Sequence, residues 1–163
     1  MNKTKKDNEG CGMIEIKAPN PIRDDGYTMF LAGSIEMGKA ENWQDKVIRL
    51  LKDRKDIIIF NPRRDDWDSS WEQTIDNEQF REQVEWELRA MEHADKILMY
   101  FDKKTKSPIS LLELGLFAYT GKLTVVCPEG FWRKGNVDIV CRRYGIQQEK
   151  TLEEAVNRLN QND

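Results

Sequence analysis

Four short apolar runs, each bounded by polar or turn residues, constrain the fold of this chain most strongly. None of them alternates polar with apolar residues, so each is expected to be buried on both faces, as in a parallel sheet. The segments between them carry apolar residues at helical spacing, and strands that alternate with helices indicate a sheet covered on both sides. The predicted strands are 28–32, 56–60, 95–101 and 123–127.

The rest of the chain is organised around these strands. Helices are predicted around 43–51, over 77–93 and 108–119, and around 152–159, while 128–144 is interpreted as an irregular basic and aromatic stretch. Residues 1–25 are expected to be a partly disordered tail, within which 14–21 is compatible with a short edge strand. Residues 26–163 are expected to form one domain.

Composition excludes several classes of function. The net charge is -3, and Lys and Arg are interspersed with Asp and Glu, so no basic face for a nucleic acid is expected. No run approaches the ~18 apolar residues of a membrane span, so no membrane partner is expected. The charged N-terminus lacks the apolar segment of a secretory signal, which predicts a cytoplasmic location.

Cysteine and histidine usage limits the chemistry further. The three cysteines lack C-x-x-C spacing, so neither a disulfide framework nor a zinc site is predicted. With His93 as the single histidine, we expect no metal, no cofactor and no His-based acid–base catalysis. An enzyme of this composition is expected to use carboxylates.

Ligands of such sheets bind beyond the carboxyl ends of the strands, so the loops there supply the candidate site residues. The loop containing Gly33, Ser34 and Lys39 can offer backbone N–H groups to an anion or a sugar hydroxyl. In the long loop 61–75, Asp66 either contacts a ligand or pairs with a neighbouring arginine. Trp67 is a candidate for stacking on a planar ligand such as a base.

Two glutamates are the candidate catalytic groups. Ser107 and Pro108 are a natural N-cap and first helical residue, which places Glu113 near a helix start, where the helix dipole favours an ionised carboxylate. The alternative is a capping box of Ser110 and Glu113, although the apolar surroundings of Glu113 weigh against it. Glu87 borders the apolar stripe of its helix, and the alternative is an ordinary boundary residue on the surface.

These residues together resemble the nucleoside 2-deoxyribosyltransferase-like family over about 29–146. The motifs that carry the resemblance are Asn61-Pro-Arg-Arg-Asp-Asp-Trp67, Trp86-Glu-Leu88, Ser107-Pro-Ile-Ser-Leu-Leu-Glu-Leu-Gly115 and Gly130-Phe-Trp-Arg-Lys-Gly-Asn-Val-Asp138. The resemblance implies a flavodoxin-like three-layer α/β domain with a mostly parallel five-stranded sheet, working as a homo-oligomer. It also implies that Glu113 attacks the anomeric carbon, and that Glu87 protonates or orients the departing base.

The chain differs from characterised transferases of this family at two positions. Those enzymes carry Asp where this chain has Glu87, and Asp where it has Ser107. Related hydrolases of 2-deoxynucleoside 5-monophosphates resemble this chain in having Ser at the second position, which implies that Ser34, Lys39 and Ser107 hold a phosphate. Asn136 is the nearest match to an asparagine that reaches into the neighbouring subunit's site, and Asp138 is the other option.

Three functions are therefore compatible with the sequence. The first is transfer of 2-deoxyribose between nucleobases through a glycosyl-enzyme intermediate on Glu113, with a nucleoside or nucleotide and a free nucleobase as substrates. The second is hydrolysis of the N-glycosidic bond of a 2-deoxynucleoside 5-monophosphate. The third is a non-catalytic nucleotide-binding or sensor module of the same fold.

Overall fold

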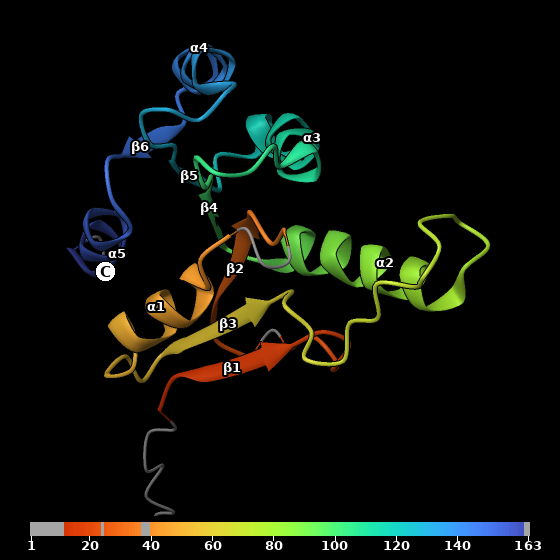
Figure 1. Cartoon of the computed structure of the whole chain (residues 1–163). Helices are drawn as coiled ribbons and strands as arrows, with labels where there is room; N and C mark the ends of the chain where they lie inside the picture. Colours follow the sequence, from red (N-terminus) through yellow and green to blue (C-terminus); the bar gives the residue numbers. More distant parts are fainter. Residues whose placement is uncertain (1–11, 24, 37–39, 162–163) are drawn as a thin grey trace, which may run out of the picture.

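The apolar runs form the centre of one parallel sheet in a computed structural model that describes residues 12–23, 25–36 and 40–161 (Figure 1). The strands are β1 (Ile14–Lys17), β2 (Tyr27–Gly33), β3 (Ile57–Asn61), β4 (Lys96–Tyr100), β5 (Leu123–Val126) and β6 (Gln147–Glu149). Their order across the sheet is β1-β3-β2-β4-β5-β6, and every neighbouring pair is parallel. The flavodoxin-like three-layer fold is confirmed.

The sheet has six strands where five were expected, and the difference lies at its edges. β1 extends the sheet beside β3, from the segment that was compatible with an edge strand. β6 pairs with β5 at the other edge, and its residues are Gln-Gln-Glu. An edge strand this short and polar carries no apolar pattern, so the sequence gives no sign of it. The predicted domain boundary at residue 26 stays a prediction.

Within the described residues, five helices cover the two faces of the sheet (Figure 1). They are α1 (Trp43–Leu50), α2 (Glu78–His93), α3 (Pro108–Phe117), α4 (Lys134–Tyr144) and α5 (Leu152–Gln161), with a 3-10 turn (Ala118–Thr120) after α3. The core on one face takes buried residues from α1 and α5, and the core on the other takes them from α2, α3 and α4. None of these described helices has the length and apolarity to cross a membrane.

The helix α4 corrects the interpretation of 128–144 as irregular. It buries Val137 and Cys141, which are four residues apart and therefore lie on one face of the helix. The helix also carries basic side chains, Arg142 and Arg143 among them, so the apolar spacing is difficult to recognise in the sequence.

The site-bearing loops meet where β2 and β4 lie side by side. From β2 the chain crosses to β3 on one side, and from β4 it crosses to β5 on the other, so the switch point at which such sheets form their ligand-binding crevice lies between the two strand ends. Gly33 ends β2 with φ 138°, and a Cβ atom there would lie 2.1 Å from the carbonyl oxygen of Tyr100. Only glycine permits this approach, which fixes where the loop after β2 begins.

Candidate active site

Glu87 and Glu113 come from two helices packed on the same face of the sheet. Glu113 is the sixth residue of α3 and is buried, with 8% of its surface exposed. Glu87 is the tenth residue of α2 and is half-buried. The charge of Glu87 raises the pKa of Glu113, so the two carboxyl groups are electrostatic neighbours. The structure thus brings together the two candidate catalytic residues.

The start of α3 excludes the capping-box alternative for Glu113. The helix begins at Pro108 with Ser107 in the N-cap position, so Ser110 lies inside the helix rather than at its cap. Ser107 has left-handed backbone angles (φ 47°, ψ 53°), and its side chain makes no cap hydrogen bond. Glu113 is therefore one turn too far along the helix to satisfy the free N–H groups.

Glu113 differs from the sequence prediction in its charge. Burial, and then the neighbouring charge of Glu87, raise the pKa of Glu113 to about 8. The prediction that the helix dipole keeps this carboxylate ionised is wrong for the free protein. The dipole acts mainly within the first turn of a helix, whereas Glu113 lies in the second turn among apolar side chains.

Glu87 also holds its proton more tightly than an ordinary glutamate. Burial raises the pKa of Glu87 to about 7, and a hydrogen bond from Gln83 opposes that rise. With pKa values of about 7 and about 8, both carboxyl groups keep a substantial protonated fraction at neutral pH. One group can then act as an acid while the other acts as a base or nucleophile.

Gln83 is a site residue that sequence reasoning missed. Its Nε2 donates to Glu87 Oε1 at 2.7 Å and to the carbonyl oxygen of Pro62 at 2.9 Å. The side chain is buried, and its Oε1 has no hydrogen-bond partner among the described residues. A Gln four residues before a Glu is common on helix surfaces, so the pair gave no signal in the sequence.

Replacing Gln83 with methionine is expected to shift the pH dependence of the reaction. Methionine keeps the volume but removes the N–H donor, so the pKa of Glu87 should rise by about one unit. The limb of the kcat/KM profile near pH 7 should move to higher pH by that amount, as measured across pH 5 to 9. Gln79→Met, on the exposed side of α2, is the control. An unmoved limb would show that Gln83 does not tune Glu87.

A cluster of three buried hydroxyl groups joins the loop after β2 to the loop before α3. The oxygen atoms of Ser34, Thr105 and Ser107 lie 2.6 to 3.0 Å from one another. Thr105 also donates to the carbonyl oxygen of Asp102, and Ser34 accepts from the Asp102 N–H, both at 2.9 Å. The protons of Ser34 and Ser107 are then the ones left for contacts within the cluster. Lys39, predicted beside them, lies outside the described residues.

Asp66 and Trp67 belong to a second cluster, inside the long loop after β3. Asp66 accepts two hydrogen bonds of 2.9 Å from Arg64, which lower the pKa of Asp66. The Arg64 guanidinium lies 5.1 Å from the ring of Trp71, and that ring packs edge-on against Trp67 at 5.0 Å. Pairing of Asp66 with a neighbouring arginine, one of the two sequence alternatives, is what the structure shows.

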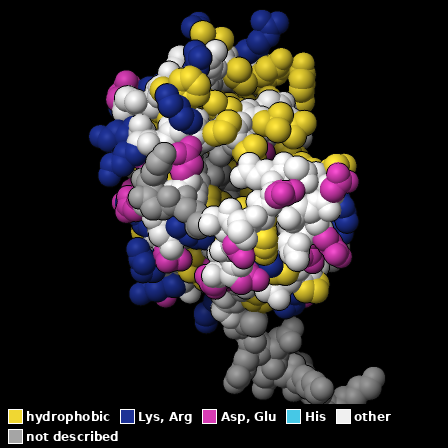
Figure 2. Space-filling model, turned by 45° about the vertical axis from the view of Figure 1, so that its right-hand side comes forward, with side chains coloured by type: hydrophobic (Ala, Val, Ile, Leu, Met, Phe, Trp, Pro, Cys, Tyr) yellow, Lys and Arg dark blue, Asp and Glu magenta, His cyan; other side chains and the backbone are white. Residues whose placement is uncertain are grey.

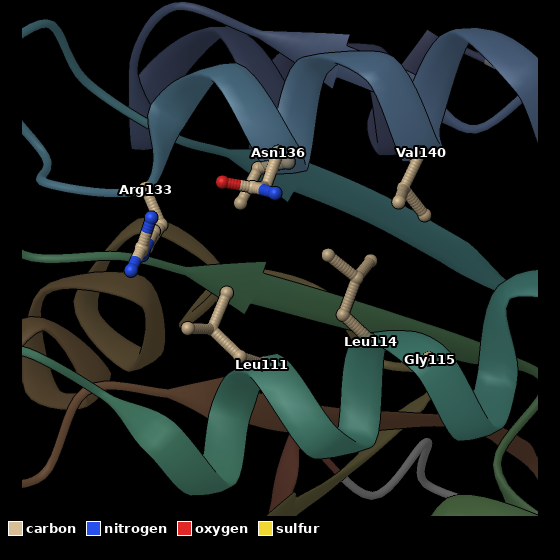
Figure 3. A pocket seen from close by; sticks show the side chains of 7 residues that line it. Leu111, Leu114, Gly115, Arg133, Asn136 and Val140 are labelled. Carbon is tan, nitrogen blue, oxygen red and sulfur yellow. The ribbon is translucent and has the colours of Figure 1, made fainter.

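Asn136 lines a pocket of about 290 Å³ between α3 and α4 (Figure 3). Leu111 and Leu114 point from α3 toward α4, and Asn136 and Val140 face them (Figure 3). Glu113 is not among the lining residues. The largely apolar lining does not suit the transfer of a charged or hydroxylated sugar, so the carboxyl pair is the better candidate site.

The described residues contain no group of three or more His, Cys, Asp or Glu side chains arranged to hold a metal ion.

A comparison with curated proteins gives no match. Residues 26–131, which run from the start of β2 to the turn before α4 and include both Glu87 and Glu113, match the family described as nucleoside 2-deoxyribosyltransferase like. This match spans more than half of the chain, and the fold agrees with it. The chain belongs to the nucleoside 2-deoxyribosyltransferase-like family.

Proposed function

We propose that this protein transfers 2-deoxyribose between nucleobases through a covalent intermediate on Glu113. The observation that carries the proposal is the pair of glutamates on α2 and α3, Glu87 and Glu113, whose pKa values are both raised by burial. Cleavage of an N-glycosidic bond needs one carboxylate to attack carbon and one carboxylic acid to protonate the departing base. Membership of the family supports the same chemistry.

In the first half of the reaction, the Glu113 carboxylate forms a bond to C1′ as the bond from C1′ to the base nitrogen breaks. The electron pair of the broken bond stays on the base, which takes a proton from Glu87. A base nitrogen that accepts a hydrogen bond from Glu87 favours the protonated form of this residue and leaves the negative charge on Glu113. The products are a free base and a glycosyl ester on Glu113.

In the second half, a nitrogen of the acceptor base attacks C1′ and displaces Glu113, while Glu87 receives the proton that this nitrogen loses. Two displacements at one carbon give overall retention of configuration. Water in place of the acceptor base would turn the same site into a hydrolase. Exclusion of water after the first base leaves therefore decides between transfer and hydrolysis.

The experiment that tests the proposal supplies 2-deoxyinosine with and without adenine and separates the products by chromatography. Transfer gives 2-deoxyadenosine and hypoxanthine only when adenine is present. Hypoxanthine released equally without adenine would identify a hydrolase instead. Binding of the nucleoside by calorimetry without any turnover would identify a non-catalytic binding module.

We also propose that the long loop after β3 contacts the base of the substrate. Trp67 is half-buried, so part of its ring remains available for stacking. The first residues of this loop are held against α2 by the hydrogen bond from Gln83 to the carbonyl oxygen of Pro62. Gln83 lies one helical turn before Glu87. A base stacked on Trp67 would therefore be supported by the same helix that carries its proton donor.

A face of exposed apolar side chains on α3 and α4 supports a homo-oligomer. Ile109, Leu112 and Leu116 of α3 are 60%, 59% and 55% exposed, and Ile139 of α4 is 69% exposed. Hydrophobic side chains gather in the upper part of Figure 2, the height at which α3 and α4 lie in Figure 1. Monomeric proteins rarely expose large contiguous patches of this kind. We propose that a second copy covers this face and brings its Asn136 to the site.

Replacing Leu112 with glutamate is expected to reduce the oligomer to monomers, because a charge would be buried in the proposed interface. Analytical ultracentrifugation of the wild type should give a multiple of the 163-residue chain mass, and the variant should give the chain mass. Ile75→Glu is the control, since Ile75 is 76% exposed in the loop after β3. A wild type that sediments as a monomer at micromolar concentration would contradict this assembly.

A further inference from the structure

Glu36 occupies a position at the β2 and β4 strand ends that would suit an anion. Its Oε1 accepts hydrogen bonds from the backbone N–H groups of Lys106 and Ser107, both at 2.9 Å. Two successive N–H groups beside a residue in the left-handed region, here Ser107 with φ 47°, form a concave surface that binds anions. The anion bound there is the protein's own carboxylate.

These N–H groups are placed where the far end of a substrate would lie. They stand at the crevice between β2 and β4, where ligands of such sheets bind. Glu113 follows Ser107 by six residues, or about 9 Å along the axis of α3. A sugar bound with C1′ at Glu113 and C5′ directed toward the start of the helix would bring its C5′ substituent to these donors. A phosphate on C5′ would need the donors that Glu36 occupies.

The neighbouring hydroxyl groups do not offer a replacement for those donors. Ser34 and Ser107 hydrogen-bond to each other at 2.6 Å, and Thr105 donates to the carbonyl oxygen of Asp102. All three side chains are buried, with at most 4% of their surface exposed. Their protons are used within the cluster, so a phosphate would meet oxygen lone pairs rather than free O–H donors.

The charge of Glu36 is not neutralised by a salt bridge within the described residues. Lys106, whose N–H is one of the two partners, has its Nζ 4.4 Å from the ring of Trp132. Arg133 stacks on the same ring at 4.3 Å. A phosphate brought to these strand ends would thus meet the oxygen atoms of a carboxylate, which accept hydrogen bonds and offer none.

From these contacts we infer that Glu36 is a specificity-determining residue that selects substrates with a free 5-hydroxyl group. This inference rests on the proposed function and names the substrate class as 2-deoxynucleosides rather than their 5-monophosphates. A hydroxyl can donate to the carboxylate, whereas a phosphate is repelled by it, and like charges in contact discriminate strongly between ligands.

The test compares kcat/KM for 2-deoxyinosine and 2-deoxyinosine 5-monophosphate in the wild type, Glu36→Gln and Glu36→Ala. The wild type is expected to prefer the nucleoside by at least about 100-fold. Glu36→Ala, which frees both N–H groups, should shift this ratio at least about tenfold toward the monophosphate. Glu36→Gln removes the charge with little change of shape and should shift it in the same direction.

Glu41→Ala is the matched control, because it removes an exposed carboxylate from the same β2–α1 connection. Its ratio should equal that of the wild type, and an equal shift would show that general charge, not Glu36, sets the preference. A wild type that prefers the monophosphate would overturn the inference and leave the proposed glycosidic chemistry intact.

A binding measurement separates failure of the inference from failure of the proposed function. Inorganic phosphate is titrated into the wild type and Glu36→Ala by calorimetry, whether or not either nucleoside is turned over. Phosphate binding by Glu36→Ala alone supports the role of Glu36 even if the enzyme assay fails. Equal binding by both proteins, or binding by neither, overturns it.

Discussion

Replacing Glu113 with glutamine is expected to lower kcat for deoxyribosyl transfer by at least about 10⁴-fold, because an amide cannot form the bond to C1′. The substitution is nearly isosteric, so the fold should persist. Mass spectrometry of wild-type protein quenched during turnover should show the added mass of one deoxyribosyl group, and the variant should show none. Steady-state rates from the chromatographic assay supply the fold-change.

Glu85→Gln provides the control for this prediction, since Glu85 is an exposed glutamate on α2, two residues from Glu87. Its kcat should match that of the wild type. Glu87→Gln should lie between the two, with a loss of about 10²- to 10⁴-fold for a missing general acid. Full activity in Glu113→Gln would remove this residue from the chemistry, whereas full activity in Glu87→Gln would remove only its partner.

Glu113→Gln is also expected to make the folded protein more stable than the wild type at pH 8. Burial raises the pKa of Glu113 from 4.5 to about 8 and that of Glu87 from 4.5 to about 7. In the unfolded chain both groups ionise near pH 4.5, so between pH 4.5 and 8 the folded protein binds more protons. The free energy of unfolding therefore falls as pH rises through this window, by about 1.4 kcal/mol for each unit of difference between the folded and unfolded pKa values.

Urea unfolding at pH 5 and at pH 8 measures this effect. The wild type should lose stability between the two values, and Glu113→Gln should lose much less and exceed the wild type at pH 8. The range ends at pH 8 because burial raises the pKa of the Cys127 and Cys141 thiols to about 11 and about 12, and these groups add their own dependence at higher pH. A wild type that is more stable at pH 8 than at pH 5 would contradict the prediction.

The loss of activity and the gain in stability of Glu113→Gln would have the same physical cause. A carboxyl pair poised for acid and nucleophilic catalysis must be held together in an apolar setting, and this destabilises the folded state. The rest of the α2 and α3 face is ordinary core, with Trp86, Met91 and Leu114 buried. The stability lost at the pair is offset by this apolar burial.

The central strands were predictable because their apolar runs leave few alternatives. Positions 28–32, 56–60 and 123–127 are buried in the structure almost throughout, as the absence of polar alternation required. β6 and α4 were not predictable, for opposite physical reasons. β6 is held by backbone pairing at a sheet edge, and α4 buries few side chains among many charged ones.

For the candidate site, the sequence indicated two candidate carboxylates but not their pKa values. Glu87 and Glu113 lie on separate helices, and their mutual effect on pKa depends on how α2 and α3 pack. The role of Glu36 was likewise hidden, because its partners are backbone N–H groups 70 and 71 residues further along the chain. Side-chain identity gives no sign of which backbone donors a loop will meet.

The close approach of Gly33 to Tyr100 has a consequence for how this protein can diverge or be engineered. The contact between β2 and β4, called the seam below, cannot accept a larger residue at position 33 without a shift of the backbone from which both loops extend. In a saturation library, position 33 should tolerate glycine alone, while neighbouring loop positions such as 35 accept many residues. New substrate preferences would then arise by exchanging side chains around an invariant seam, not by reshaping the crevice itself.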